Sequence, residues 1–186
     1  MEIPKEILEK IAALSKPAII AISGFGGSGK STFAGMLGER MGAPVVDVDS
    51  FARNRLGGGS NWDAFDFARL EREVLIPFIE DQDPIIHGQY DWGENAVIST
   101  RQVHHDGLLI IEGVGLFRPE LLKYFSYKIW IDVPLEESIE RGKKRDREVY
   151  NNPQDEKWNG IWKTNDTEFF EKFDPKGIAD VIISNI

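Results

Sequence analysis

The chain has 186 residues, 41% of them hydrophobic and 28% charged, which is ordinary for a globular protein with one substantial core. Its formal net charge of −9 argues against a nucleic-acid polymer or an anionic membrane as the main partner, because both favour basic proteins. It contains no cysteine, which excludes disulfides and thiolate metal sites. The start shows no signal-peptide pattern, and no apolar run approaches the ~20 residues that span a bilayer. We therefore expect a cytoplasmic protein with a single domain over residues 1–186.

The first predicted elements are a helix, a strand and a second helix. Apolar residues recur at helical spacing over residues 4–14, which predicts a helix that packs against a sheet. Residues 18–22 form an uninterrupted apolar run, which is typical of a buried strand. A glycine-rich loop separates this strand from a helix predicted over residues 32–40, which ends near Gly42.

The loop between this strand and helix has the spacing of a phosphate-binding loop, Gly-x-x-x-x-Gly-Lys-Ser, over residues 24–31. Its glycines let successive backbone N–H groups turn toward a phosphate, and the helix N-terminus adds partial positive charge. Lys30 is expected to reach the β- and γ-phosphates, and the Ser31 hydroxyl to bind Mg²⁺. The predicted ATP-binding residues are Gly24, Gly26, Gly27, Ser28, Gly29, Lys30, Ser31 and Thr32.

The same glycines also satisfy the dinucleotide fingerprint Gly-x-Gly-x-x-Gly. Asp49 even follows about 20 residues later, where such a fold carries its ribose-binding acid. Lys30 and Ser31 favour the phosphate loop, because a triphosphate site needs both side chains and a dinucleotide site needs neither. A glycine-rich turn without a ligand is a weaker alternative, since these glycines cost backbone entropy that a plain turn does not require.

A second buried strand, predicted over residues 45–49, carries Asp47 and Asp49 at its end. Ligands bind at this edge in open α/β sheets. In an extended chain the two carboxylates face the same way, and one of them could act as general base on a substrate hydroxyl near Mg²⁺. The alternative is that Asp49, followed by Ser50, only caps the next turn.

Residues 52–62 form a polar, glycine-rich loop that includes Arg53. This segment is either a lid or substrate loop or a disordered surface loop. Apolar residues at helical spacing then predict a helix over residues 67–81.

A hairpin is predicted within residues 82–103, with a turn at residues 90–93 between two short strands. Its aromatic side chains, which include Tyr90 and Trp92, could stack on a base or a sugar beside the site. They could equally belong to the core, and both interpretations stay open.

Glu112 ends the third predicted buried strand, over residues 107–113. In phosphate-loop enzymes an acid at the end of a neighbouring strand holds Mg²⁺, often through water. A lone acid could simply terminate the strand. Because Glu112 is the second case of an acid at the end of a buried strand, the metal interpretation is favoured.

A fourth strand over residues 127–133 precedes a helix over residues 135–147 that ends in a basic cluster. Arg141 and Arg145 are four residues apart and therefore share a helix face. Two guanidinium groups there could hold the oxygens of a transferred phosphoryl group. A solvated helix C-terminus, where cations are favoured anyway, is the alternative.

The last predicted elements are an aromatic-rich helix through residues 158–170 and a fifth strand over residues 178–183. Five buried strands separated by helices predict an α/β fold with a parallel sheet and helices on both faces. The small hairpin stands apart from this three-layer arrangement.

Taken together, the motifs resemble the uridine kinase-like branch of phosphate-loop small-molecule kinases, which is related to phosphoribulokinase. The resemblance extends over roughly residues 18–184, with the motifs in the family's order. They are the phosphate loop through Thr32, Asp49-Ser50-Phe51, Asn61-Trp62-Asp63-Ala64-Phe65-Asp66, Tyr90-Asp91, Ile111-Glu112-Gly113, Arg141 with Arg145-Asp146, and Ala179-Asp180-Val181-Ile182-Ile183.

The resemblance implies a three-layer P-loop NTPase fold and an ATP- and Mg²⁺-dependent kinase with a nucleoside as acceptor. It implies that Asp49 activates the acceptor hydroxyl and that Asp63 contacts the ribose. Tyr90 and Asp91 would lie near the base. Arg141 and Arg145 would belong to a lid over residues 141–157.

The sequence departs from the family pattern in the acceptor region and in the lid. Asn95 and Val97 stand where the family has a histidine and an arginine. The family's Glu-Arg-Gly-Arg lid segment is replaced by residues 148–151, which read Glu-Val-Tyr-Asn.

Two further functions stay open at this stage. One is a kinase for another acceptor, such as nicotinamide riboside, pantothenate or a sugar. The other is a nucleotide-dependent switch that hydrolyses ATP slowly, which leaves Asp49 without a role. The oligomeric state is open as well.

Overall fold

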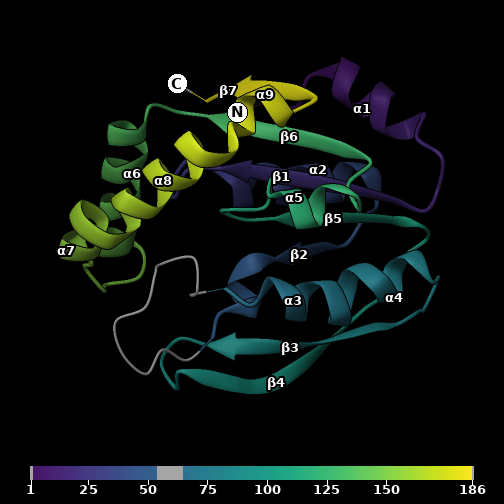
Figure 1. Cartoon of the computed structure of the whole chain (residues 1–186), viewed down its shortest axis with the longest axis horizontal. Coiled ribbons are helices and arrows are strands. Elements are labelled where there is room, and N and C mark those ends of the chain that lie inside the picture. Colours follow the sequence, from purple (N-terminus) through teal and green to yellow (C-terminus); the bar gives the residue numbers. More distant parts are fainter. Residues whose placement is uncertain (1, 54–64, 186) are drawn as a thin grey trace.

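The structure is a computed structural model that describes residues 2–53 and 65–185. Its centre is a five-stranded parallel sheet in the order β2-β5-β1-β6-β7, as Figure 1 shows. The strands of this sheet are β1 (Ala18–Gly24), β2 (Val45–Asp47), β5 (Leu108–Glu112), β6 (Tyr127–Asp132) and β7 (Val181–Ser184). The sheet predicted from the five apolar runs is confirmed.

Helical segments surround this sheet. They are α1 (Lys5–Ala12), α2 (Lys30–Met41), η1 (Val48–Phe51), α3 (Phe67–Leu70), η3 (Glu71–Leu75), α4 (Ile76–Ile79), α5 (Pro119–Leu122), α6 (Leu135–Glu148), α7 (Asp155–Lys157), η4 (Trp158–Trp162), α8 (Lys163–Phe173) and α9 (Pro175–Ile178). Within the described part of the chain, no helix combines the length and the apolar character needed to cross a membrane.

Two hydrophobic clusters cover the two faces of the sheet. On one face, α1 and α2 pack against alternate residues of β1, β5 and β6. On the other face, α3, η3, α4, α5 and α8 pack against the residues between them. This alternation follows from the extended chain, whose successive side chains point to opposite faces. The three-layer α/β fold is therefore confirmed.

The predicted hairpin is present and longer than expected. Its strands are β3 (Ile85–Asp91) and β4 (Ala96–Val103), which pair antiparallel. Tyr90 and Asp91 were expected in the turn, but they end β3. The turn instead occupies the next four residues, where Asn95 has a φ of 53°. β3 contacts η1, so the hairpin lies beside the carboxyl end of β2.

Two predicted strand boundaries were wrong. The second strand ends at Asp47, and the chain turns at once into the 3-10 helix η1. The last strand starts at Val181 rather than at residue 178. The reason is local: the Asp174 side chain accepts a hydrogen bond from the Gly177 N–H at 3.2 Å and caps the short helix α9.

Candidate functional site

The phosphate loop connects β1 to α2 and is held closely by its neighbours. Gly27 and Gly29 have φ angles of 83° and 96°, which only glycine adopts readily. A Cβ at Gly27 would come within 2.1 Å of the backbone oxygen of Ser138 in α6. These glycines are therefore required both by the backbone turn and by the approach of α6.

Lys30 begins α2, and its side chain is buried inside the loop. Its Nζ donates a hydrogen bond to the Phe25 backbone oxygen at 2.8 Å. Burial lowers the pKa of Lys30, while the negative charges of Glu112, Asp166 and Asp49 act in the opposite direction. The loop lysine thus stands at the centre of a group of carboxylates.

Glu112 ends β5 beside Asp47 of β2 and Ile22 of β1, its register partners. Burial raises the pKa of Glu112, and the nearby charges of Asp49 and Asp47 raise it further. Lys30 and a hydrogen bond with Ser31 lower it. The parallel topology thus brings an acid from β5 to the hydroxyl that follows the loop lysine.

The residues at this edge fit a magnesium ion. Ser31 and Glu112 offer the oxygen ligands that Mg²⁺ prefers, and the acids around Glu112 leave an excess of negative charge that a divalent cation would offset. Among the described residues, no three His, Cys, Asp or Glu side chains gather into a ready-made metal site. Mg²⁺ commonly takes one or two protein ligands and the rest from phosphates and water.

The structure separates the two acids that follow β2. The Asp47 side chain accepts hydrogen bonds from the Ser50 N–H at 2.8 Å and from the Ser50 hydroxyl at 3.0 Å. The cap that had been considered for Asp49 therefore belongs to Asp47. Asp49 lies in the middle of η1 with its side chain exposed.

Asp49 interacts electrostatically with the other charged residues of the site. Desolvation by the surrounding protein is the largest cause of the raised pKa of Asp49, although the side chain is accessible to solvent. The negative charge of Asp47 raises this pKa further. Lys30 and Arg145 act in the opposite direction. A carboxylate that is accessible, basic and near the loop lysine can accept a proton from a bound hydroxyl.

Two side chains that the sequence did not single out hold η1 in place. Arg69 donates to the Ser50 backbone oxygen, and its guanidinium lies 4.9 Å from the centre of the Phe51 ring. The His87 ring of β3 stacks on Phe51 with centroids 5.2 Å apart. No local sequence pattern predicts these contacts, because the residues in contact come from separate segments of the chain.

The two arginines of α6 have different surroundings. Arg145 donates through Nε and Nη2 to Oδ1 of Asp146, at 3.1 and 2.8 Å. Arg141 instead donates to the Asn185 backbone oxygen at 2.7 Å and to Glu137. Of the two, Arg145 influences the pKa of both Lys30 and Asp49. The lid role of both arginines, and the lid over residues 141–157, stay predictions.

A third missed residue, Trp158 of η4, packs on the phosphate loop and on α6. Its Nε1 donates to Oδ2 of Asp146 at 2.7 Å, so Asp146 joins Trp158 to Arg145. A Cβ at Gly26 would lie 3.0 Å from the Trp158 ring, and one at Gly142 would lie 2.3 Å from it. The aromatic-rich helix was predicted without a role, and its contact with the loop was not foreseen.

The predicted acceptor residues have local partners. Arg53 donates to the Phe65 backbone oxygen at 3.2 Å. Tyr90 hydrogen-bonds to Asn95, and Oδ1 of Asp91 accepts two N–H groups of the following turn at 2.8 Å each. Asp63, and most of the loop predicted over residues 52–62, lie outside the described residues. Contact of these side chains with an acceptor stays a prediction.

Comparison with known proteins agrees with this arrangement. A model of the AAA_18 family, described as an AAA domain, matches residues 20–159, which is most of the chain. Among solved structures, a possible uridine kinase from Bacillus stearothermophilus has a TM-score of 0.72 and 19% identity, with 96% of this chain and 95% of that chain covered.

A second solved structure, a Silicibacter protein described as a fructose transport system kinase, has a TM-score of 0.68 and 22% identity. The match covers 89% of this chain and 90% of that chain. At these identities the comparison establishes a shared fold, and it confirms the P-loop kinase fold that the motifs predicted. The chain belongs to the AAA_18 family.

Proposed function

We propose that this protein is an ATP- and Mg²⁺-dependent kinase that transfers the γ-phosphoryl group to a hydroxyl of a small molecule, with a nucleoside as acceptor. The observation that carries the proposal is the grouping of Lys30, Glu112 and Asp49 at the carboxyl edge of β1, β5 and β2, where Lys30 and each of the two carboxyl groups shift each other's pKa. A phosphate loop alone fits any P-loop protein. An accessible carboxylate beside its lysine fits transfer to a hydroxyl.

On the donor side, backbone N–H groups of the loop would hold the phosphates, and Lys30 would neutralise the β- and γ-oxygens. Lys30 would exchange its bond to the Phe25 oxygen for one to phosphate. Ser31 and Glu112 would hold Mg²⁺, Glu112 through water; when bound, the ion offsets charge on the phosphate oxygens.

On the acceptor side, Asp49 would accept the proton of the attacking hydroxyl. The hydroxyl oxygen forms a bond to the γ-phosphorus as the bond from that phosphorus to the ADP oxygen breaks. The raised pKa of Asp49 strengthens it as a base at neutral pH. Arg145, with Arg141, would stabilise charge on the transferred group.

The nucleoside acceptor is proposed from the hairpin and its position. β3 contacts η1, which carries Asp49, and the Tyr90 and Trp92 rings meet edge to face with centroids 5.3 Å apart. Trp92 is 60% exposed, so its ring is free to stack on a base. Arg53, Asp63 and Asp91 would complete the acceptor contacts.

An acceptor panel tests the proposal. Purified protein with ATP and Mg²⁺ is given nucleosides, nicotinamide riboside, pantothenate and sugars in turn, and ADP release is followed. We expect release that depends on a nucleoside, and a higher melting temperature with that nucleoside and a non-hydrolysable triphosphate. Release that depends on a sugar would keep the kinase and change the acceptor. Release that is slow and equal in every reaction would contradict a kinase and favour a switch.

A further inference from the structure

The phosphate loop has a negatively charged neighbour that the proposed reaction does not use. Asp166 lies on α8, and its Oδ2 accepts a hydrogen bond from the Gly26 backbone N–H at 2.8 Å. The side chain is buried, with 6% of its surface exposed. Backbone N–H groups of such loops are the groups that cradle phosphate oxygens. A carboxylate of the protein itself therefore sits among the donors that a nucleotide would need.

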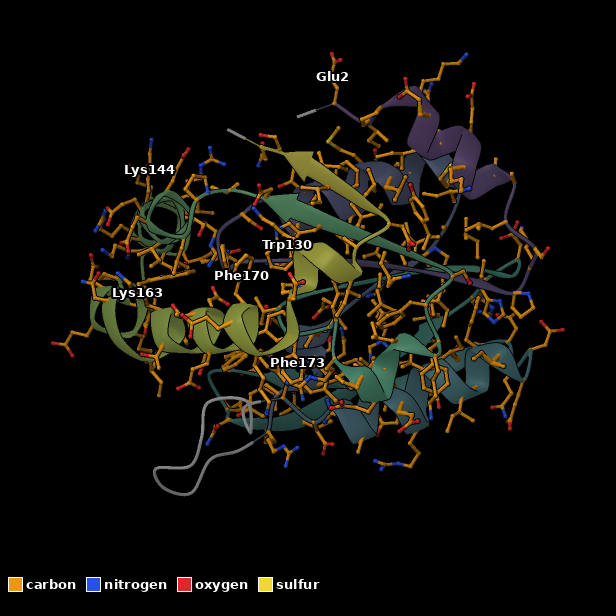
Figure 2. The ribbon with its side chains drawn as sticks, turned by 45° about the horizontal axis from the view of Figure 1, so that its top comes forward. Glu2, Trp130, Lys144, Lys163, Phe170 and Phe173 are labelled. Carbon is orange, nitrogen blue, oxygen red and sulfur yellow. The ribbon has the colours of Figure 1, made fainter. Side chains whose placement is uncertain are left out.

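Aromatic packing fixes this carboxylate in place. Phe170 follows Asp166 by one helical turn, so the two side chains share a face of α8. Its ring lies 5.3 Å from that of Phe25 in the loop and 5.9 Å from that of Trp130 in β6. Figure 2 shows Trp130 and Phe170 between α8 and the sheet. Because the same cluster joins the loop to α8, the contact between Asp166 and Gly26 is a built part of the fold.

Charge makes this contact sensitive to a bound anion. Burial raises the pKa of Asp166 to about 6, while the Gly26 N–H and the charge of Lys30 act in the opposite direction. Of the elements that pack on α8, α6 carries Arg145 and Asp146, which pair with each other, and Glu136, which pairs with a lysine of α8; η4 carries no charged residue. On α8 itself, Lys163 pairs with Glu136 and points outward in Figure 2.

We propose that Asp166 is a further residue of the nucleotide site, an internal anion that competes with the triphosphate for the phosphate loop and takes up a proton when the triphosphate binds. The proposal rests on the proposed function only in requiring that nucleotide phosphates bind this loop. The proton comes from solvent, and no covalent bond changes. Negative phosphate oxygens beside Asp166 disfavour its ionised form, so the bound protein holds the proton more tightly than the free protein.

The direction of the pH effect follows. Below a pH of about 6 Asp166 is largely neutral in the free protein, and binding requires no further proton. Above that pH the proton must come from solvent, where the proton concentration falls tenfold for each pH unit. Triphosphate affinity therefore falls by at most about tenfold for each pH unit. Replacement by Asn keeps an oxygen acceptor for the Gly26 N–H and removes the charge.

Calorimetric titration of the whole protein with ATP and Mg²⁺, in the absence of an acceptor, tests this. Wild type, Asp166→Asn and the control Glu168→Gln are compared from about pH 6 to about pH 8, in buffers with different ionisation enthalpies. Glu168 is exposed on the same helix, so its replacement removes one charge without touching the loop. ATP ionises identically in all three titrations, and the differences between them therefore report the protein.

We expect Asp166→Asn to bind ATP about tenfold or more tightly than wild type at the high end of this range and nearly equally at the low end. Wild type and Glu168→Gln should take up more protons on binding than Asp166→Asn. Equal affinity of Asp166→Asn and wild type at every pH would overturn the proposal while leaving the kinase assignment intact. A ratio of the Asp166→Asn affinity to the wild-type affinity that stays constant with pH would also overturn it. Failure of wild type to bind ATP at any pH would overturn both.

Discussion

At the scale of single residues, the site is defined by charges that the fold brings close together. Lys30, Glu112 and Asp49 come from three segments; Lys30 shifts the pKa of both carboxyl groups, and each of them shifts the pKa of Lys30. Their positions at loop and strand ends could be predicted, because parallel strands present their carboxyl ends at one edge. The position of Asp166 beside the loop could not be predicted, because the two residues that its hydrogen bond joins are 140 positions apart in the sequence.

Arg145 gives the first prediction at this scale. Arg145→Ala should lower turnover by about 10³-fold or more and change ATP affinity only a few-fold, because such an arginine stabilises charge that develops during transfer. Steady-state kinetics and a separate measurement of ATP binding would check it. Lys144→Ala is the matched control: Lys144 lies on the same helix, points outward in Figure 2 and is paired only at 4.0 Å with Glu148. Turnover of Arg145→Ala within a few-fold of the control would remove Arg145 from the mechanism.

Asp166 gives a second prediction, on stability. Its pKa is raised from 3.8 to about 6 by folding, so between these values the folded state binds more protons than the unfolded state. The free energy of unfolding attributable to this residue therefore falls as pH rises through that window and is fully lost above it. The free energy of unfolding of Asp166→Asn, relative to that of wild type, should therefore be higher at about pH 7 than at about pH 4. The expected increase is up to about 3 kcal/mol. Denaturant unfolding at both pH values measures this gain, and an unchanged difference would contradict the burial argument.

At the scale of elements, the long apolar strands followed from the sequence and the short helical pieces did not. β1 and β5 are buried along their whole length, so their apolar runs are unambiguous. η1 arises because the Asp47 side chain caps the turn with Ser50, a local competition that an extended pattern does not reveal. The general base candidate is therefore held by a 3-10 helix rather than by a strand.

The anchoring of η1 predicts a positioning role for Arg69. Arg69→Ala removes the donor to the Ser50 oxygen and the contact with Phe51, and should cost about 1–3 kcal/mol of stability. Because Asp49 lies on the same short helix, turnover should fall while ATP affinity is kept. Arg72→Ala, in the adjoining η3 and with an exposed side chain, is the control and should change neither quantity appreciably. Equal turnover of the two variants would show that η1 holds Asp49 without Arg69.

At the scale of the whole molecule, the sheet order places the proposed donor and acceptor parts on neighbouring strands. β1 carries the phosphate loop, β5 carries Glu112, and β2 leads into η1 and the hairpin beside it. The motifs predicted the acids at the strand ends, whereas the strand order was not predicted. The packing of η4 and α8 against the loop could not be predicted, since Trp158 and Phe170 look like ordinary core residues in the sequence. Both residues belong to the helix predicted through residues 158–170, for which the sequence suggested no contact with the loop.

The proposed reaction transfers the phosphoryl group from ATP to an acceptor hydroxyl, with Asp49 as base. ³¹P NMR of reactions with ATP, Mg²⁺ and the acceptor found by the panel measures this directly, because a phosphate ester and inorganic phosphate give separate signals. We predict that wild type forms the ester, and that Asp49→Asn binds ATP with similar affinity but forms the ester at least about 10²-fold more slowly. Inorganic phosphate as the only new product would contradict transfer to an acceptor, and equal ester formation by Asp49→Asn would contradict the role of Asp49 as base.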